Sequence, residues 1–183
     1  MKQVYIVLTK TNTVLARFIR FATGCEYSHA SISMDPELTR MYSFSRKHVR
    51  NPFFGGFMKE CPGRHVFGLF EDVPCAVIAV QVDEHQYAQI EDMLRAFKAE
   101  SGRYGYNYFG LLHNLLKLRQ KNHRSFFCSE FVYHVLYESR AVNLGLQPCQ
   151  VRPQDLLFVG GKLVYRGNLN TIPQTGIPLA RGA

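Results

Sequence analysis

The chain contains no uninterrupted run of about 18 apolar residues, the length that a membrane-spanning helix requires. Its opening residues, MKQVYIVLTK, have too short an apolar run for a signal peptide and lack a small-residue cleavage site. These two absences predict no transmembrane segment and a cytoplasmic location. Internal repeats and low-complexity blocks are absent as well. The length of 183 residues, with 46% hydrophobic residues, therefore predicts one globular domain.

Close-spaced cysteine pairs are also absent. The five cysteines are scattered, at Cys25, Cys61, Cys75, Cys128 and Cys149. An odd, scattered set predicts reduced thiols rather than a disulfide framework. Cys25 with His29 and Cys61 with His65 share one spacing, but the paired-cysteine knuckle of a zinc site is missing, so we expect no metal. Gly55-Gly56 lacks the strand–loop–helix context of a nucleotide-binding loop, so no cofactor is expected either.

The chain has few acidic residues: it contains 22 lysine and arginine residues but only 14 aspartate and glutamate residues, and its formal net charge is +8. Most of the basic residues are dispersed, which argues against a nucleic-acid partner. One denser cluster runs from Lys117 to Arg124. This cluster indicates either a solvated loop or a surface for an anionic partner.

Alternation and turn signals predict a mixed order of elements. Strands are expected at residues 3–9, 28–34, 40–45, 65–70, 75–82 and 156–166. Helices are expected at about 13–23, at 83–101, after the aromatic stretch YGYNYFGLL, and from Cys128 onward. Residues 46–64, with a proline and paired glycines, are predicted to be irregular. The order predicts an α+β domain over residues 1–167, with antiparallel strands packed against helices, and a Pro/Gly-containing tail over 168–183.

Cys128 stands at the head of a predicted helix in FFCSEFVYHVL. A thiol at a helix N-terminus feels the positive end of the helix dipole, which favours the reactive thiolate. His29, on the predicted strand YSHASISM, could act as its base. The alternative is a buried structural thiol, because Cys128, Phe131 and Val132 share the apolar face of the helix.

The order of these motifs resembles a known family. VYIVLTKTNTVLARFIRFATGCEYSHASISMD is similar to the opening of circularly permuted papain-like proteins of the NlpC type, including the bacterial YiiX-like group. YGYNYFGLL, FFCSEFVYHVL and VRPQDLLF resemble the aromatic loop, the cysteine helix and the closing element of the same family. Lecithin:retinol acyltransferase-like proteins are similar in layout. The resemblance covers about residues 3–160 and implies a permuted papain-like fold, with the histidine before the cysteine.

By the same resemblance, Cys128 would be the nucleophile and His29 the general base of a cysteine hydrolase of the amidase or peptidase type. The family's third site residue lies on the strand after the histidine strand, here RMYSFSR, where Ser43 or Ser45 is available and Ser43 is favoured. A serine accepts a hydrogen bond from the imidazole but supplies no negative charge.

The expected substrate is a small molecule, a peptide or a lipid-like acyl compound. Two alternatives remain. One is a lipid-directed acyltransferase on the same Cys–His pair, with Phe53, Phe54 and Phe57 capping the pocket. The other is a non-catalytic binding module. The backbone N–H of Cys128 and a tyrosine of YGYNY are the candidate oxyanion donors.

Overall fold

The computed structural model describes residues 1–13, 16–17, 20–21, 24–48, 51–101, 105–106, 125–172 and 177. For residues 46–48, 51–55, 105–106 and 125 it describes only the backbone. Among the described residues, no helix is both long and apolar enough to cross a lipid bilayer.

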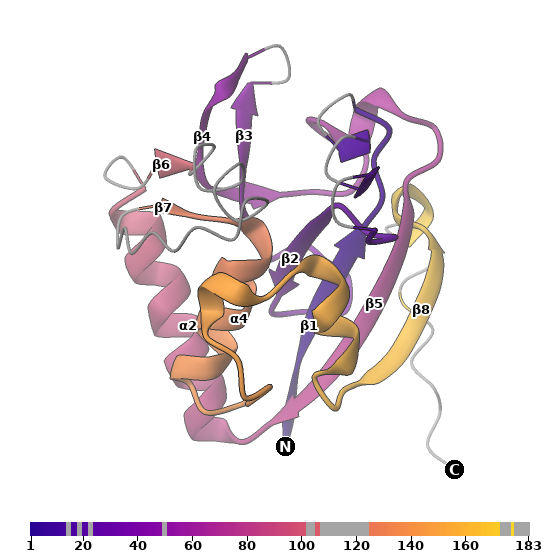
Figure 1. The fold of residues 1–183 in the computed structure, drawn as a ribbon. Helices are drawn as coiled ribbons and strands as arrows, with labels where there is room; N and C mark the ends of the chain where they lie inside the picture. Colours follow the sequence, from indigo (N-terminus) through magenta and orange to yellow (C-terminus); the bar gives the residue numbers. More distant parts are fainter. Residues whose placement is uncertain are drawn as a thin grey trace.

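Six antiparallel strands form the main sheet, in the order β4-β3-β2-β1-β5-β8 (Figure 1). The strands are β1 (Lys2–Thr9), β2 (His29–Ser33), β3 (Met41–His48), β4 (Asn51–Glu60), β5 (Pro74–Val82) and β8 (Lys162–Asn168). A separate parallel pair joins β6 (Gly105–Tyr106) to β7 (Ser125–Phe126). The sheet and its helices confirm the α+β class that the sequence predicts.

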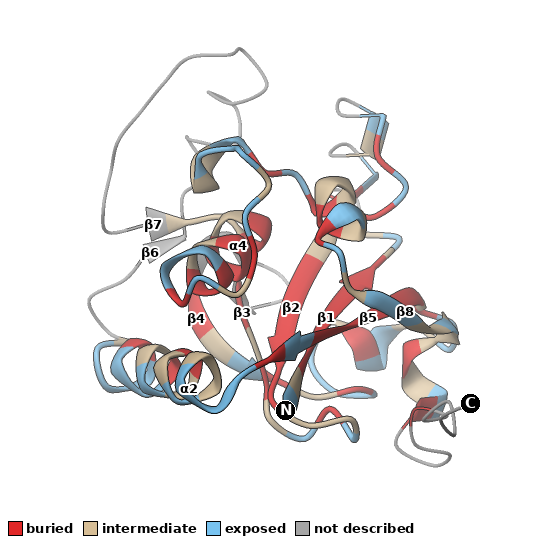
Figure 2. Ribbon diagram, turned by 90° about the horizontal axis from the view of Figure 1, so that it is seen from below, coloured by how far each residue is buried: buried red, intermediate tan, exposed pale blue. Residues whose placement is uncertain are grey.

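Both faces of the sheet are covered around β1. Val4, Ile6 and Leu8 belong to one apolar cluster, and the alternate residues Tyr5 and Val7 belong to a second. Since successive side chains of a strand point to opposite faces, the near-continuous apolar run of β1 reflects burial on both sides. Figure 2 shows this burial concentrated on the central strands.

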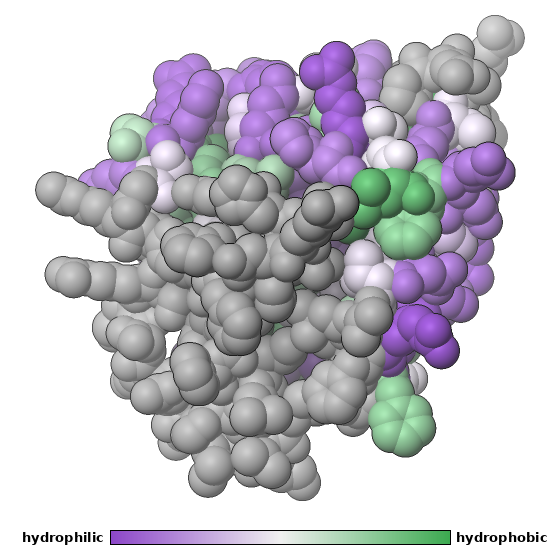
Figure 3. Space-filling model, turned by 90° about the horizontal axis from the view of Figure 1, so that it is seen from above, coloured by the Kyte–Doolittle hydropathy of each residue, from purple (hydrophilic) through white to green (hydrophobic). Residues whose placement is uncertain are grey.

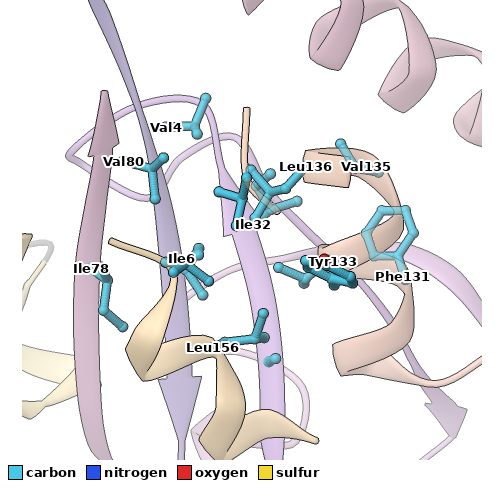
Figure 4. Packing of buried hydrophobic residues seen from close by; sticks show 14 of the residues in the cluster. Val4, Ile6, Ile32, Ile78, Val80, Phe131, Tyr133, Val135, Leu136 and Leu156 are labelled. Carbon is cyan, nitrogen blue, oxygen red and sulfur yellow. The ribbon is translucent and has the colours of Figure 1, made fainter. Parts of the chain in front are cut away.

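The first cluster lies between the sheet and two helices, α2 (Glu84–Ala99) and α4 (Cys128–Glu138). Asp83 caps α2, because its carboxylate accepts a hydrogen bond from the Gln86 N–H at 2.7 Å and the Gln86 side chain accepts one from the Asp83 N–H. In Figure 4, strand residues such as Ile32 face α4 residues such as Leu136 across this core. The apolar face of α4 thereby fixes the helix against β2 and β3.

The second cluster lies on the opposite face. It includes Phe67 of the 3-10 helix η1 (Phe67–Leu69), together with Leu169 and Ile172 from the region of η4 (Leu169–Thr171). The expected tail over 168–183 therefore begins at the last residue of β8, and its first residues contribute to the core.

Several sequence predictions are corrected at this level. Residues 51–60, predicted to be irregular, form β4 despite their proline and glycines. The strand expected at 65–70 is η1, and the strand expected at 156–166 is divided between η3 (Pro153–Phe158) and β8. The helix expected after YGYNYFGLL lies outside the described residues.

Candidate active site

Cys128 is the first residue of α4, and Phe127 is its N-cap. The Phe127 N–H donates to the Glu130 carboxylate at 3.1 Å, and Ser129 Oγ donates to the Val151 carbonyl at 2.7 Å. These contacts fix the first turn of α4 against the chain that follows the helix. The N–H groups of a first helical turn have no partner within the helix. Cys128, only 6% exposed, therefore lies at a positive helix end.

His29 is the first residue of β2 and lies opposite Thr9, the last residue of β1. Its side chain is 16% exposed, and Phe67 packs near its ring at a centroid distance of 6.3 Å. The Nε2 atom of His29 lies 3.0 Å and 3.2 Å from the two carboxylate oxygens of Glu60. Glu60, at the end of β4, is 5% exposed. The imidazole thus has a buried acidic partner that comes from two strands away.

The pairing of the strands explains how Glu60 reaches His29. Glu60 pairs with Met41 of β3, and Met41 pairs with Ser33 of β2. Among the described strand residues, β2 and β3 pair only at Ser33–Met41 and at Ile32–Tyr42. Closer to His29 the ladder between these two strands stops. The Glu60 side chain reaches toward His29, and Ser31 Oγ, which lies between Ser33 and His29 on β2, donates to Glu60 Oε2 at 2.5 Å.

Ser43 does not take the position that the sequence predicted for it. It is fully buried on β3, and its Oγ makes no hydrogen bond in the structure. It lies close enough to Glu60 to help lower the pKa of that carboxyl, but the imidazole is held by Glu60. The alternative, Ser45, is half-buried. In the structure the β3–β4 hairpin carries a carboxylate, that of Glu60, to the imidazole of His29.

Each member of this pair shifts the other toward its charged form. Burial by itself lowers the pKa of His29, but the negative charges of Glu60 and of an ionised Cys128, and hydrogen bonds to both, raise it to about 10. Burial by itself raises the pKa of Glu60, but the charge and hydrogen bond of His29, with the hydroxyls of Ser31 and Ser43, lower it overall. At neutral pH the site therefore holds an imidazolium next to a carboxylate.

Cys128 and His29 lie close enough to interact, since α4 packs against β2 and Cys128 contributes to the raised pKa of His29. Cys75 provides a contrast within the same chain. It is buried in β5, and burial raises its pKa to about 12. Cys128 lies beside the imidazole of His29, whereas the neighbouring charge at Cys75 is negative, because Asp72 also helps to raise the pKa of that thiol. The first arrangement can hold a thiolate–imidazolium pair, and the second favours the neutral thiol.

Of the remaining sequence-predicted site residues, only Phe57 has a described side chain. The cluster from Lys117 to Arg124, most of the YGYNY loop, and the side chains of Phe53 and Phe54 lie outside the described residues. Phe57 is buried in the first apolar cluster rather than at a pocket. Within the part of the chain that the structure describes, no three His, Cys, Asp or Glu side chains group closely enough to hold a metal ion.

Sequence reasoning missed Glu60 and Ser31. For Ser31 a signal was present, since His29, Ser31 and Ser33 alternate with apolar residues in a strand that is otherwise buried. Three polar residues on one buried strand face need partners, and such a face indicates a polar site. Glu60 carries no comparable signal, because its segment contains a proline and two glycines and did not resemble a strand.

Comparison with known proteins adds no family to this geometry: no family model matches the chain, and no curated protein matches it.

Proposed function

We propose that the protein is a cysteine hydrolase that cleaves an amide or ester bond through an acyl-thioenzyme. One observation carries the proposal. A nearly buried thiol at the start of α4 interacts with His29, and a buried carboxylate holds the other side of the same imidazole. Cys128 is the nucleophile, His29 the proton carrier, and Glu60 the group that orients His29 and stabilises its positive charge.

The first half of the reaction transfers the acyl group to sulfur. The Cys128 thiolate attacks the carbonyl carbon, and the carbonyl electrons move to oxygen. The first N–H groups of α4 face such an oxyanion with the positive end of the helix. When the tetrahedral intermediate collapses, the bond to the leaving group breaks. The leaving amine or alcohol takes the proton from His29, which becomes neutral.

The second half regenerates the thiolate. Neutral His29 accepts a proton from a water molecule, the resulting hydroxide attacks the thioester carbon, and the carbon–sulfur bond breaks. The products are a carboxylic acid and the Cys128 thiolate, with His29 again protonated. Glu60 stays ionised throughout. It accepts the Nε2–H hydrogen bond at 3.0 Å, which leaves the Nδ1 nitrogen for the thiol.

We further propose that the fold is the permuted papain-like one. Two features support it: the histidine strand precedes the cysteine helix along the chain, and the helix packs on an antiparallel sheet. The residue equivalent to the family's third member would then be Glu60. It lies on the strand beyond the one that the resemblance indicated.

Selective alkylation tests the proposal. Cys61 and Cys149 are half-buried, whereas Cys128 is buried. Accessibility alone would therefore make iodoacetamide modify Cys128 more slowly than these two thiols. If Cys128 is an activated thiolate, it should react faster at pH 7, by roughly tenfold or more. Peptide mapping after short reaction times measures all five rates in one sample.

Matched variants complete this test. His29→Ala should remove the rate advantage of Cys128, whereas His85→Ala, an exposed histidine on α2, should leave it unchanged. Equal labelling of all thiols in the unmodified protein would contradict the proposal. Intact mass after incubation with an activated aryl ester should show one acyl group that is absent from Cys128→Ala. An acyl group that leaves only when an alcohol or amine acceptor is added would indicate an acyltransferase instead.

A further inference from the structure

Ser31 lies on the same face of β2 as His29, two residues further along the strand. It is fully buried, and its Oγ lies 2.5 Å from Glu60 Oε2 and 3.4 Å from His29 Nε2. The hydroxyl therefore touches both members of the charged pair. It does so from the strand that carries His29, whereas Glu60 comes from β4.

The geometry leaves the carboxylate in need of a second donor. Both oxygens of Glu60 are within hydrogen-bonding distance of Nε2, but a ring nitrogen carries only one hydrogen. A buried carboxylate oxygen without its own donor is costly, and Glu60 has three side-chain torsions through which it could turn away. The backbone of Glu60 pairs with Met41 of β3, but strand pairing does not fix the torsions of the Glu60 side chain.

We propose that Ser31 is a positioning residue that locks the Glu60 carboxylate onto His29. This inference rests on the proposed function, because it gives Ser31 a role in the Cys128–His29–Glu60 site. Ser31 does not touch the reacting thiol. It acts by holding one carboxylate oxygen, so that the other accepts from Nε2. The titratable groups that face His29 are Glu60 from β4 and Cys128 from α4.

Ser33 provides a matched control. It lies on the same strand and the same face and is also fully buried, but its Oγ donates to the Asp35 carbonyl in the adjacent turn at 3.0 Å. The Ser33 hydroxyl also accepts from the Asp35 N–H at 3.4 Å, so removing either hydroxyl deletes hydrogen bonds that a side chain of β2 makes. Only the Ser31 hydroxyl contacts the charged pair.

The experiment follows the alkylation rate of Cys128 by iodoacetamide against pH. In Ser31→Ala the rate at pH 7 should fall by roughly fivefold, the effect of losing one buried hydrogen bond to a charged group. The midpoint of the acid side of the profile should rise by about half a pH unit or more. Ser33→Ala should match the unmodified protein, and Ser31→Thr, which keeps a hydroxyl, should restore most of the rate. If Ser31→Ala does not fold, Ser31→Cys, with a weak S–H donor, takes its place.

A double-mutant cycle with Glu60→Gln identifies the route of the effect. If Ser31 acts through Glu60, Ser31→Ala should change the rate little once Glu60 is replaced. Equal profiles for Ser31→Ala and Ser33→Ala, or additive effects in the cycle, would overturn the inference while Cys128 remains selectively reactive. Loss of selective reactivity in the unmodified protein would instead overturn the proposed function.

Discussion

Two strand pairs of the same sheet differ sharply. β1 and β5 pair over eight consecutive residues, from Lys2–Val82 to Thr9–Cys75, with mostly branched apolar side chains. β2 and β3 pair at only two positions, and a histidine, two serines and a glutamate occupy the region beyond. The regular pair has its backbone groups satisfied by the ladder. Along the interrupted pair, polar side chains on one face of the sheet bond to one another.

The two strand pairs therefore contribute to different properties, one to the stability of the fold and the other to the reactivity of the site. A buried ion pair gains little net stability, because the cost of removing both charges from water roughly offsets their attraction. The β1–β5 pair, by contrast, buries apolar area on both faces of the sheet. We therefore assign the stability of the fold mainly to β1–β5 and the reactivity mainly to the interruption between β2 and β3.

Figure 3 views the molecule from above, the side at which β1 ends opposite His29. On this side of the molecule, the surface of the described residues is mostly hydrophilic, with a few apolar side chains among the hydrophilic ones (Figure 3).

The largest expected effect comes from the regular pair. Ile6→Ala removes a fully buried side chain from the first cluster and should lower the free energy of unfolding by about 3–5 kcal/mol. Urea unfolding measures the loss. The alkylation rate of Cys128 in the folded fraction should not change. A large fall in that rate with full stability would reverse our assignment of the two regions.

The second effect is the pH dependence of stability. The pKa of Glu60 is lowered on folding, so its contribution is present above its unfolded value of 4.5 and is lost as pH falls through the folded pKa. The pKa of His29 is raised, so its contribution is complete below 6.5 and is lost as pH rises toward about 10. We expect the pair to stabilise most between these values, with an alkaline loss on the order of 2 kcal/mol.

The free energy of unfolding in urea can be measured from pH 5 to 10 for the unmodified protein and for His29→Gln. The difference between the two proteins at each pH gives the contribution of the His29–Glu60 pair. In Cys128→Ala the alkaline decline should still begin near pH 6.5 but should be smaller and end at lower pH, because Cys128 no longer helps to raise the pKa of His29 in the folded protein. A difference between the two proteins that does not vary with pH would show that His29 and Glu60 are not coupled.

The third effect concerns Glu60 itself. Glu60→Gln keeps a hydrogen-bond acceptor for Nε2 but removes the charge that stabilises the imidazolium, so the alkylation rate of Cys128 at pH 7 should fall by about tenfold. Glu71→Gln, at an exposed position after η1, is the control. An unchanged rate in Glu60→Gln would mean that orientation alone, without charge, activates the pair.

The smallest expected effect is on the free energy of unfolding and comes from variants at the start of α2, a helix that does not carry the proposed reactive residues. Asp83→Ala removes the cap of α2 and should cost about 1 kcal/mol of unfolding free energy. Glu84→Ala, which breaks only an exposed pair with Lys2, should cost less than about 0.5 kcal/mol. Neither variant should change Cys128 reactivity. A change would indicate that α2 supports the site through its contact with α4.

Local patterns predicted the regular part of the fold well. The apolar runs of β1 and β5, the Asp83 cap of α2 and the start of the helix at Cys128 all follow from neighbouring residues, and the structure confirms them. β4 could not be recognised in the same way, because Pro52, Gly55 and Gly56 are typical of loops. Its pairing with β3, a long-range contact, overrides that local preference.

The sequence by itself thus determined that Cys128 begins a helix and that His29 lies in a strand, because helix starts and strand alternation are local properties. Only the tertiary structure decided that Glu60 is the partner of His29. That partnership depends on the register of the β3–β4 hairpin and on the point where β2 and β3 stop pairing. Register is a relation between segments distant in the chain, and no single segment encodes it.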